Sequence, residues 1–220
     1  MGKQTKLNII EEAKAAFNEK SYEAVSLHEL AQRLNMSRGN LAYHFKDKDI
    51  LLKAIVEEMW NKIKTDRSKS RQFPSFENLH NEVQLYYKYQ KEYAFVFLNP
   101  NVLNHPNVKN QFREMTEKTI EDNIATLIYS IKSGNLKPEP IPGIYHNIAF
   151  ITWMLTFYWL SQQIVRNENN GKDGEKMIWS ILVPHLTEKG LEKFKAFFGE
   201  DYFNSLGEPM DVDLSKIASF

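Results

Sequence analysis

The sequence predicts an all-α fold, and three observations support this prediction. Apolar residues recur every three or four positions along the chain, as they do on one face of an α-helix. No segment alternates β-branched and polar residues over the length of a strand. Serines stand directly before several of the periodic segments, where their hydroxyl groups cap helices.

The composition is that of a globular protein, with 42% apolar and 25% charged residues among 220. Cysteine is absent, which excludes disulfides, thiolate metal sites and cysteine nucleophiles. The six histidines have no metal-ligand spacing, and no phosphate-binding glycine motif is present, so we expect neither a cofactor nor an enzyme. Basic and acidic residues number 28 each, so any nucleic-acid binding must come from a local patch.

The first 45 residues predict three short helices. Ile9, Ala13 and Phe17 share one face of a helix that ends near residues 18–21. Ser26 begins the second as a capping box, in which Ser26 accepts from the backbone of Glu29 and the Glu29 carboxylate reaches back to the backbone of Ser26.

Ser37 begins the third helix with the same arrangement, since Met36 and Leu41 stand at the two staple positions. Asn35 lies between the second and third helices, and asparagine tolerates the left-handed conformation that a sharp turn needs. The two helices therefore form a helix-turn-helix.

A long helix is predicted from Asp47 through Leu52 and Met59 to Ile63. We interpret the basic segment 62–71 as a solvated helix end and loop rather than a second nucleic-acid site. Further helices are expected after Ser75 and from Pro106 to Gly134. The last ones cover residues 144–165 and 174–198, with a break at Pro184.

Residues 144–165 contain no Asp, Glu, Lys or Arg and are long enough to span a membrane. They also contain His146, Thr152, Gln162 and Gln163, which would be costly in hydrocarbon, so a helix buried in protein is favoured. The polar start of the chain does not resemble a secretory signal, and we expect a cytoplasmic protein.

Residues 26–51 resemble the DNA-binding domain of the TetR family of bacterial transcription regulators. The resemblance covers residues 9–56 and rests on Ala31, on the Ser37-Arg38-Gly39-Asn40-Leu41 entry and on Tyr43-His44-Phe45-Lys46 followed by Lys48. Two positions depart from the family: Asn35 replaces the usual turn glycine, and Ala42 stands where an aromatic residue is common.

The resemblance implies a DNA-binding domain at residues 1–50 and a helical ligand-binding and dimerisation domain at residues 51–220. It further implies a central cavity for a small molecule and a homodimer formed through the last two helices. From two-fold symmetry we expect a pseudo-palindromic double-stranded operator.

The third helix supplies most of the predicted DNA contacts. Leu41 and Phe45 face the core, so the opposite side of the helix faces outward. Arg38 suits guanine and Asn40 suits adenine, while residues near the helix end suit phosphates. The predicted contact residues are His28, Ser37, Arg38, Gly39, Asn40, Ala42, Tyr43, His44 and Lys48. For Tyr43 and His44, packing against the following helix is an alternative.

Aromatic residues with polar tips are frequent after residue 85, and such mixtures line pockets for apolar or aromatic ligands. Core packing and a dimer interface are the alternative explanation for each of them. The predicted ligand contacts are Tyr86, Tyr89, Tyr93, Phe97, Phe112, Trp153 and Phe157.

Together these patterns predict a sequence-specific DNA-binding transcription regulator, a repressor released from its operator by a small, largely apolar ligand. The alternative is a helix-turn-helix protein that acts constitutively as a DNA-architectural or protein-interaction module.

Overall fold

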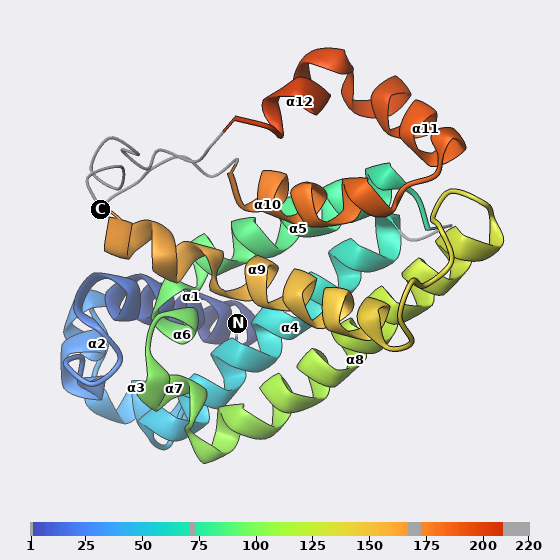
Figure 1. Cartoon of the computed structure of the whole chain (residues 1–220). Coiled ribbons are helices and arrows are strands. Elements are labelled where there is room, and N and C mark those ends of the chain that lie inside the picture. The colour runs from blue at the N-terminus through green and yellow to red at the C-terminus, as the bar shows by residue number, and fades with distance from the viewer. Residues whose placement is uncertain (1, 71–73, 167–172, 209–220) are drawn as a thin grey trace, which may run out of the picture.

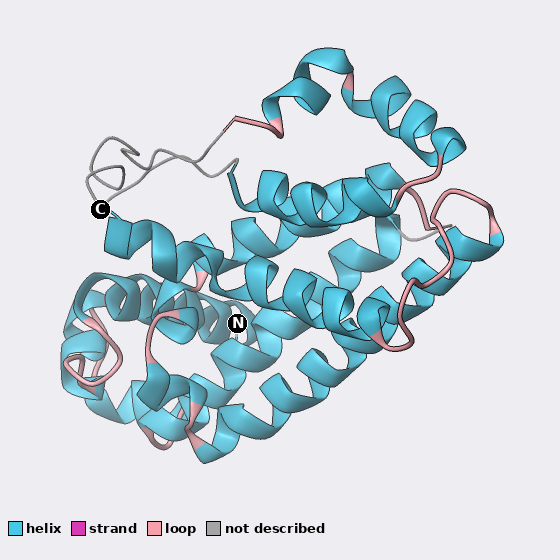
Figure 2. Ribbon diagram, viewed as in Figure 1, coloured by secondary structure: helices cyan, strands magenta, loops and turns pink. Residues whose placement is uncertain are grey.

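The computed structural model describes residues 2–70, 74–166 and 173–208. Throughout these ranges the chain forms helices joined by loops and contains no strand (Figure 2). Leu136 and Leu186 form one isolated antiparallel β-bridge. The predicted all-α fold is confirmed.

Helices α1 (Gly2–Lys20), α2 (Leu27–Arg33) and α3 (Arg38–His44) form the end of the molecule at the lower left of Figure 1. Both predicted serine caps are present: Ser26 Oγ accepts from Glu29 N and Ser37 Oγ from Asn40 N, each at 3.1 Å. The other half of the predicted capping box is wrong. The Glu29 carboxylate binds Lys20 and Arg33, because these cations offer it charge-assisted bonds.

Two residues of this region have left-handed backbone conformations. Asn35, in the turn between α2 and α3, has φ 51°, as predicted from the tolerance of asparagine. Ser21, directly after α1, has φ 80°, which no feature of the sequence indicates. A serine in this conformation pays a steric cost that glycine would avoid.

Helix α4 (Lys48–Ser70) is longer than predicted. The segment from residue 62 is a solvated helix end in part, because Lys64 and Lys69 are exposed. The expected loop is wrong up to Ser70, where the helix ends, and Arg67 is only 7% exposed. The Arg67 guanidinium pairs with Glu82 at 2.6 Å and Asp122 at 3.2 Å. A buried charge needs such partners, and here they come from two other helices.

The chain continues through α5 (Phe76–Glu92), the single-turn helices α6 (Ala94–Phe97) and α7 (Pro100–Leu103), and α8 (Pro106–Lys132). The predicted cap at Ser75 is confirmed by its bond from Asn78 N. Pro106 opens α8, and Gly134 follows its end with φ 71°.

The last helices are α9 (Ile144–Arg166), α10 (Asp173–Leu182), α11 (Glu188–Phe198) and α12 (Glu200–Ser205), with a 3₁₀ turn at Val183–His185. Trp179 and Phe194 are fully buried between α10 and α11, with ring centroids 5.2 Å apart. These residues centre a second hydrophobic core at the upper side of Figure 1.

Helix α9 has the length and composition to cross a membrane. In the structure it packs against α5, α8 and α10. Its polar groups are used in these contacts: the Thr156 carbonyl accepts from Gln90 and Gln163 accepts from Tyr87. The helix is thus bonded to protein helices through groups that hydrocarbon could not satisfy.

Ser21→Gly should stabilise the protein by roughly 0.5 kcal/mol or more. Glycine removes the left-handed strain of about 1–2 kcal/mol. Two smaller effects oppose this gain: the unfolded chain has more entropy, and the exposed hydrogen bond between Ser21 and Glu23 is removed. In a thermal unfolding experiment the melting temperature should rise by about 2 °C. The control Ala24→Gly, in the same turn with an ordinary φ, should give no such rise; equal shifts would contradict the prediction.

Candidate DNA-binding surface and ligand cavity

Helix α3 exposes one continuous side. Arg38, Gly39, Asn40 and Ala42 are all exposed, and Tyr43 is 85% exposed. Leu41 and Phe45 are buried, as the helical period predicted. The exposure of Tyr43 excludes the alternative that it packs against the following helix.

The predicted contacts at the edge of this side lie in different environments. Ser37 is exposed but uses its hydroxyl oxygen to cap α3. His28 is exposed on the first turn of α2. His44 is half-buried, with its ring edge-on to Tyr43 at 5.3 Å. Their contacts with DNA remain predictions.

Lys48 stands at the start of α4, beside the end of α3. Its ammonium lies 4.2 Å from the ring centroid of Tyr22 and donates to the carbonyl oxygen of Glu23 at 3.4 Å. Burial lowers the pKa of Lys48, and the nearby carboxylates of Glu23 and Asp49 oppose that shift.

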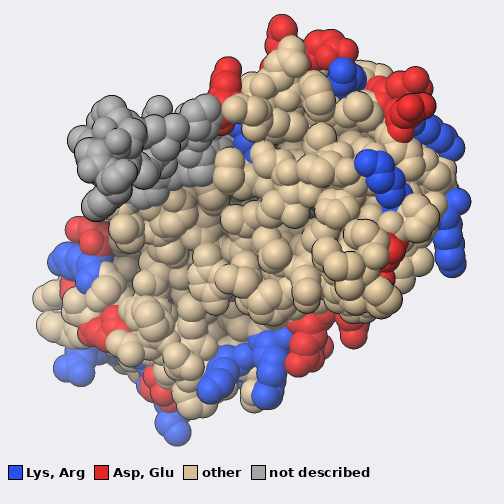
Figure 3. All heavy atoms as spheres, viewed as in Figure 1, with Lys and Arg blue, Asp and Glu red and all other residues tan. Residues whose placement is uncertain are grey.

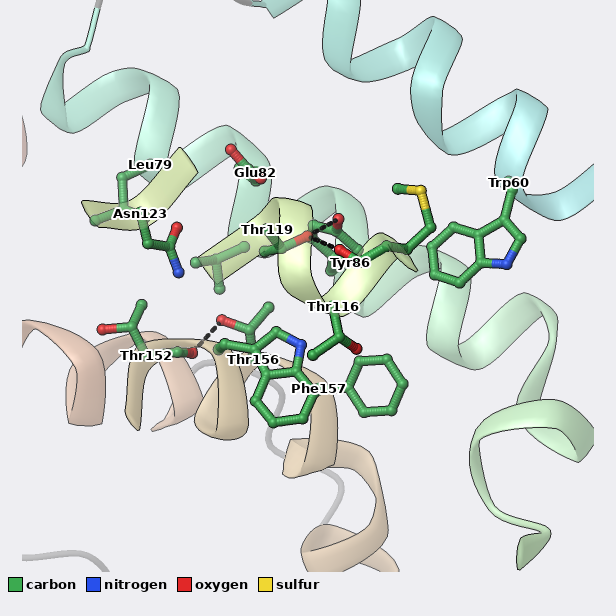
Figure 4. A pocket seen from close by; sticks show the side chains of 13 residues that line it. Trp60, Leu79, Glu82, Tyr86, Thr116, Thr119, Asn123, Thr152, Thr156 and Phe157 are labelled. Atoms are coloured by element: carbon green, nitrogen blue, oxygen red, sulfur yellow. Dashed lines mark hydrogen bonds between the residues drawn. The ribbon is translucent and has the colours of Figure 1, made fainter. Parts of the chain in front are cut away.

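An inner cavity lies between α4, α5, α8 and α9 (Figure 4). Its apolar wall includes Trp60, Tyr86, Trp153 and Phe157. Its polar wall includes the carboxylate of Glu82, which pairs with Arg67, and five hydroxyl or amide side chains: Thr116, Thr119, Asn123, Thr152 and Thr156.

Some of these polar groups bond to one another and to the helices. Tyr86 and Thr119 share a hydrogen bond of 3.3 Å, and Asn123 donates to the carbonyl of Ala149 at 3.3 Å. Threonine side chains also donate to carbonyls of their own helices, as Thr156 does to Thr152 at 2.8 Å. The polar wall is therefore held in place before any ligand binds.

A wider outer groove of about 420 Å³ adjoins the inner cavity, between the start of α5, the second half of α8 and α9. Leu79, Glu82, Asn123 and Thr152 line both spaces. The groove has the volume of a small-molecule site, whereas the inner cavity of about 20 Å³ holds little more than a water molecule. A ligand that reaches the aromatic wall must therefore displace side chains.

The predicted ligand residues divide into two groups. Tyr86, Trp153 and Phe157 line the inner cavity. Phe97 and Phe112 pack edge-on against Phe157, at 5.2 and 5.7 Å between ring centroids.

The two remaining tyrosines lie towards α1: Tyr89 is in the last turn of α5, and Tyr93 directly follows the helix. Tyr89 donates to Asp66 at 2.7 Å, and burial together with this bond raises the pKa of Tyr89. Tyr93 is buried and its hydroxyl accepts from Lys62 at 3.2 Å. Neither tyrosine lines the inner cavity, and ligand binding by all seven residues remains a prediction.

Sequence reasoning missed Trp60 and the polar wall. A usable signal existed in the threonines, because Thr116 and Thr119, and likewise Thr152 and Thr156, recur at helical spacing on faces that are otherwise apolar. Within residues 2–70, 74–166 and 173–208, no group of His, Asp and Glu side chains is arranged to hold a metal ion.

Two family models match the sequence. Residues 9–55 match the model described as "Bacterial regulatory proteins, tetR family", and residues 55–194 match the model described as "Bacterial transcriptional repressor". The chain belongs to the TetR family. It is a DNA-binding transcription regulator. No match was found among curated sequences.

Solved structures of TetR-type regulators share the fold. A TetR-family regulator from Marinobacter aquaeolei VT8 is 20% identical over 90% of this chain and 98% of its own, with a TM-score of 0.79. The SmeT–triclosan complex is 16% identical over 84% and 93%, with a TM-score of 0.65. A gamma-butyrolactone receptor (ArpA-like protein) is 16% identical over 94% and 99%, with a TM-score of 0.62.

Proposed function

We propose that this regulator is a repressor that leaves its operator when a small, largely apolar ligand binds between α5, α8 and α9. The observation that carries the proposal is that the cavity and the DNA-binding helices share one hydrophobic core, which runs from Ile9 in α1 to Phe157 in α9. The predicted domains 1–50 and 51–220 would then differ in function but share one hydrophobic core. We place the protein in the cytoplasm, where its DNA lies.

The lining of the cavity supports a ligand that is mainly apolar. Aromatic rings form one wall, and the hydroxyl and amide groups of the other wall can orient one or two polar atoms of a ligand. Two similar structures contain, or are named for, small molecules of this kind: triclosan and a gamma-butyrolactone.

Helix α4 supports a mechanism for release, because it begins at Lys48 beside α3 and carries Trp60 into the cavity wall. A ligand that displaces Trp60 favours a different position of this rigid helix. In a dimer, that changes the separation of the two recognition helices, which must match successive major grooves roughly 34 to 36 Å apart.

A homodimer is supported by an exposed apolar stripe on α9, formed by Phe150, Ile151, Met154 and Tyr158. Figure 3 shows that the face over this helix carries few charged side chains. Exposed apolar patches of this kind mark interfaces. We propose that two copies pair through α9 and the α10–α11 region.

Arg38→Ala should weaken operator binding by about 1–3 kcal/mol and relax the preference at one base pair, because it removes the bidentate hydrogen bonds to guanine. Lys48→Ala should weaken all duplexes alike and lower the salt slope by about 1 for each phosphate that the variant no longer binds. Fluorescence anisotropy with an operator selected from a random pool would measure both. If both variants bound like the wild type, the docking geometry proposed for α3 and α4 would be wrong.

Met154→Glu should convert the dimer to monomers, because it places a charge within an apolar interface. Light scattering coupled to size-exclusion chromatography measures the mass. Ile128→Glu on α8 is the matched control, since Ile128 is 46% exposed and Met154 43%, but only Met154 lies in the stripe. A dimer that survives Met154→Glu and a second change, Ile151→Glu, would contradict the interface.

Operator DNA should weaken ligand binding by the same factor by which the ligand weakens operator binding, typically about 1–3 kcal/mol of coupling. Calorimetry with a compound selected for raising the melting temperature would measure ligand affinity with and without saturating operator. Thr116→Trp, which fills the cavity, tests whether that compound uses this site. Equal affinities in the two states would leave the constitutive module as the function.

A further inference from the structure

Tyr22 lies in the turn between α1 and α2, outside the recognition helix and outside the cavity. Its ring nevertheless contacts the residue proposed to bind phosphate. The ammonium of Lys48 lies 4.2 Å from the ring centroid, well within the range of a cation–π contact, and 5.7 Å from the ring of Phe17. No pattern in the sequence indicates this contact, because Tyr22 and Lys48 are far apart along the chain.

The position of Lys48 is unfavourable in two ways. It is the first residue of α4, where the helix dipole disfavours a positive charge, and burial lowers the pKa of its ammonium. Among the described residues, the ammonium makes one hydrogen bond, to the Glu23 carbonyl. Donors therefore remain for a phosphate oxygen, since an ammonium has three. A costly placement that leaves donors unused is typical of a functional site.

The ring of Tyr22 is itself fixed on several sides. Its hydroxyl donates to Asp49 Oδ1 at 3.0 Å, and its edge meets Phe17 at 5.2 Å and His105 at 6.3 Å between ring centroids. His105 Nε2 lies 3.4 Å from the same Asp49 oxygen. Residues from α1, α4 and the start of α8 thus prevent the ring from turning away.

We propose that Tyr22 is a positioning residue for DNA binding, because its fixed ring holds the Lys48 ammonium at one place on the surface beside α3. A free lysine side chain samples many rotamers and gives up that freedom when it binds a phosphate. Lys48 has given up much of it already. The inference rests on the proposed phosphate contact of Lys48 and adds a residue that never touches DNA itself.

The test is the salt dependence of binding to a selected operator and to a random-sequence duplex. Lys48→Met should lower the slope of log affinity against log salt by roughly 2 per dimer, since each phosphate contact contributes about 0.9. Tyr22→Leu should lower it similarly, and the double variant should lower it no further. Tyr22→Phe, which keeps the ring, should retain the slope.

A matched control removes a ring-bound ammonium elsewhere. Lys195 lies 4.4 Å from the ring centroid of Phe203, far along the chain from the DNA-binding helices, so Lys195→Met should leave the slope unchanged. If Tyr22→Leu does not fold, as judged by thermal unfolding, NMR of the wild type with ¹³C-methylated lysines provides the measurement. The Lys48 signal should be displaced by the ring current and should move on addition of either duplex.

Three outcomes would overturn the inference. The wild-type slope in folded Tyr22→Leu would show that Lys48 needs no positioning, and so would a Lys48 signal without ring-current displacement. The wild-type slope in Lys48→Met, with operator preference intact, would remove the phosphate contact while leaving the proposed function standing. A wild-type protein without operator preference would instead defeat the proposed function itself.

Discussion

The short helix α6 connects the DNA-binding helices to the cavity through a pair of aromatic side chains. Phe95 meets Phe17 in the DNA-binding helices at 5.2 Å, and Phe97, two residues later, meets Phe157 in the cavity wall at 5.2 Å. Both rings belong to one buried cluster that also contains most of the apolar face of α4. Because protein interiors are close-packed, a ligand that displaces Phe157 disturbs packing that the DNA-binding helices share. This shared core therefore constrains both the DNA-binding helices and the cavity.

The contact between the DNA-binding helices and the α5–α6 region, here called the joint, has a polar edge. Lys14 of α1 pairs with Glu92 of α5 at 2.8 Å, the Asn18 side chain bonds both the Glu92 carbonyl and the Phe95 amide, and Glu23 accepts from Asn99 at 2.9 Å. Lys14 is buried, so its charge needs the Glu92 partner. The exposed bonds of Asn18 and Glu23 contribute little to stability and can re-form in a new geometry at small cost. An apolar centre with a polar edge resists separation of the two regions but permits a small tilt between them, which is what control of DNA binding by a distant ligand requires.

Local patterns predicted the parts of the structure that depend on neighbours in sequence. The caps at Ser26, Ser37 and Ser75, the left-handed turn at Asn35 and the outward side of α3 follow from residue chemistry within one helical turn. The buried role of Arg67 could not be predicted, because its partners Glu82 and Asp122 are distant in sequence. The cavity was missed in part for the same reason: four helices meet there, and only their packing shows which threonines face one space.

Because the protein has no net charge, its affinity for DNA depends strongly on the geometry that the shared core sets. With 28 basic and 28 acidic residues, the protein lacks the general field that holds basic proteins on any duplex. Attraction must come from a few local cations, for which we propose Arg38 and Lys48, and one helix-turn-helix offers too few contacts to bind tightly by itself. Affinity then depends on two recognition helices meeting two half-sites together, so that a misfit at one half-site removes much of the total. In the proposed mechanism, a small tilt across the joint is therefore enough to release the operator.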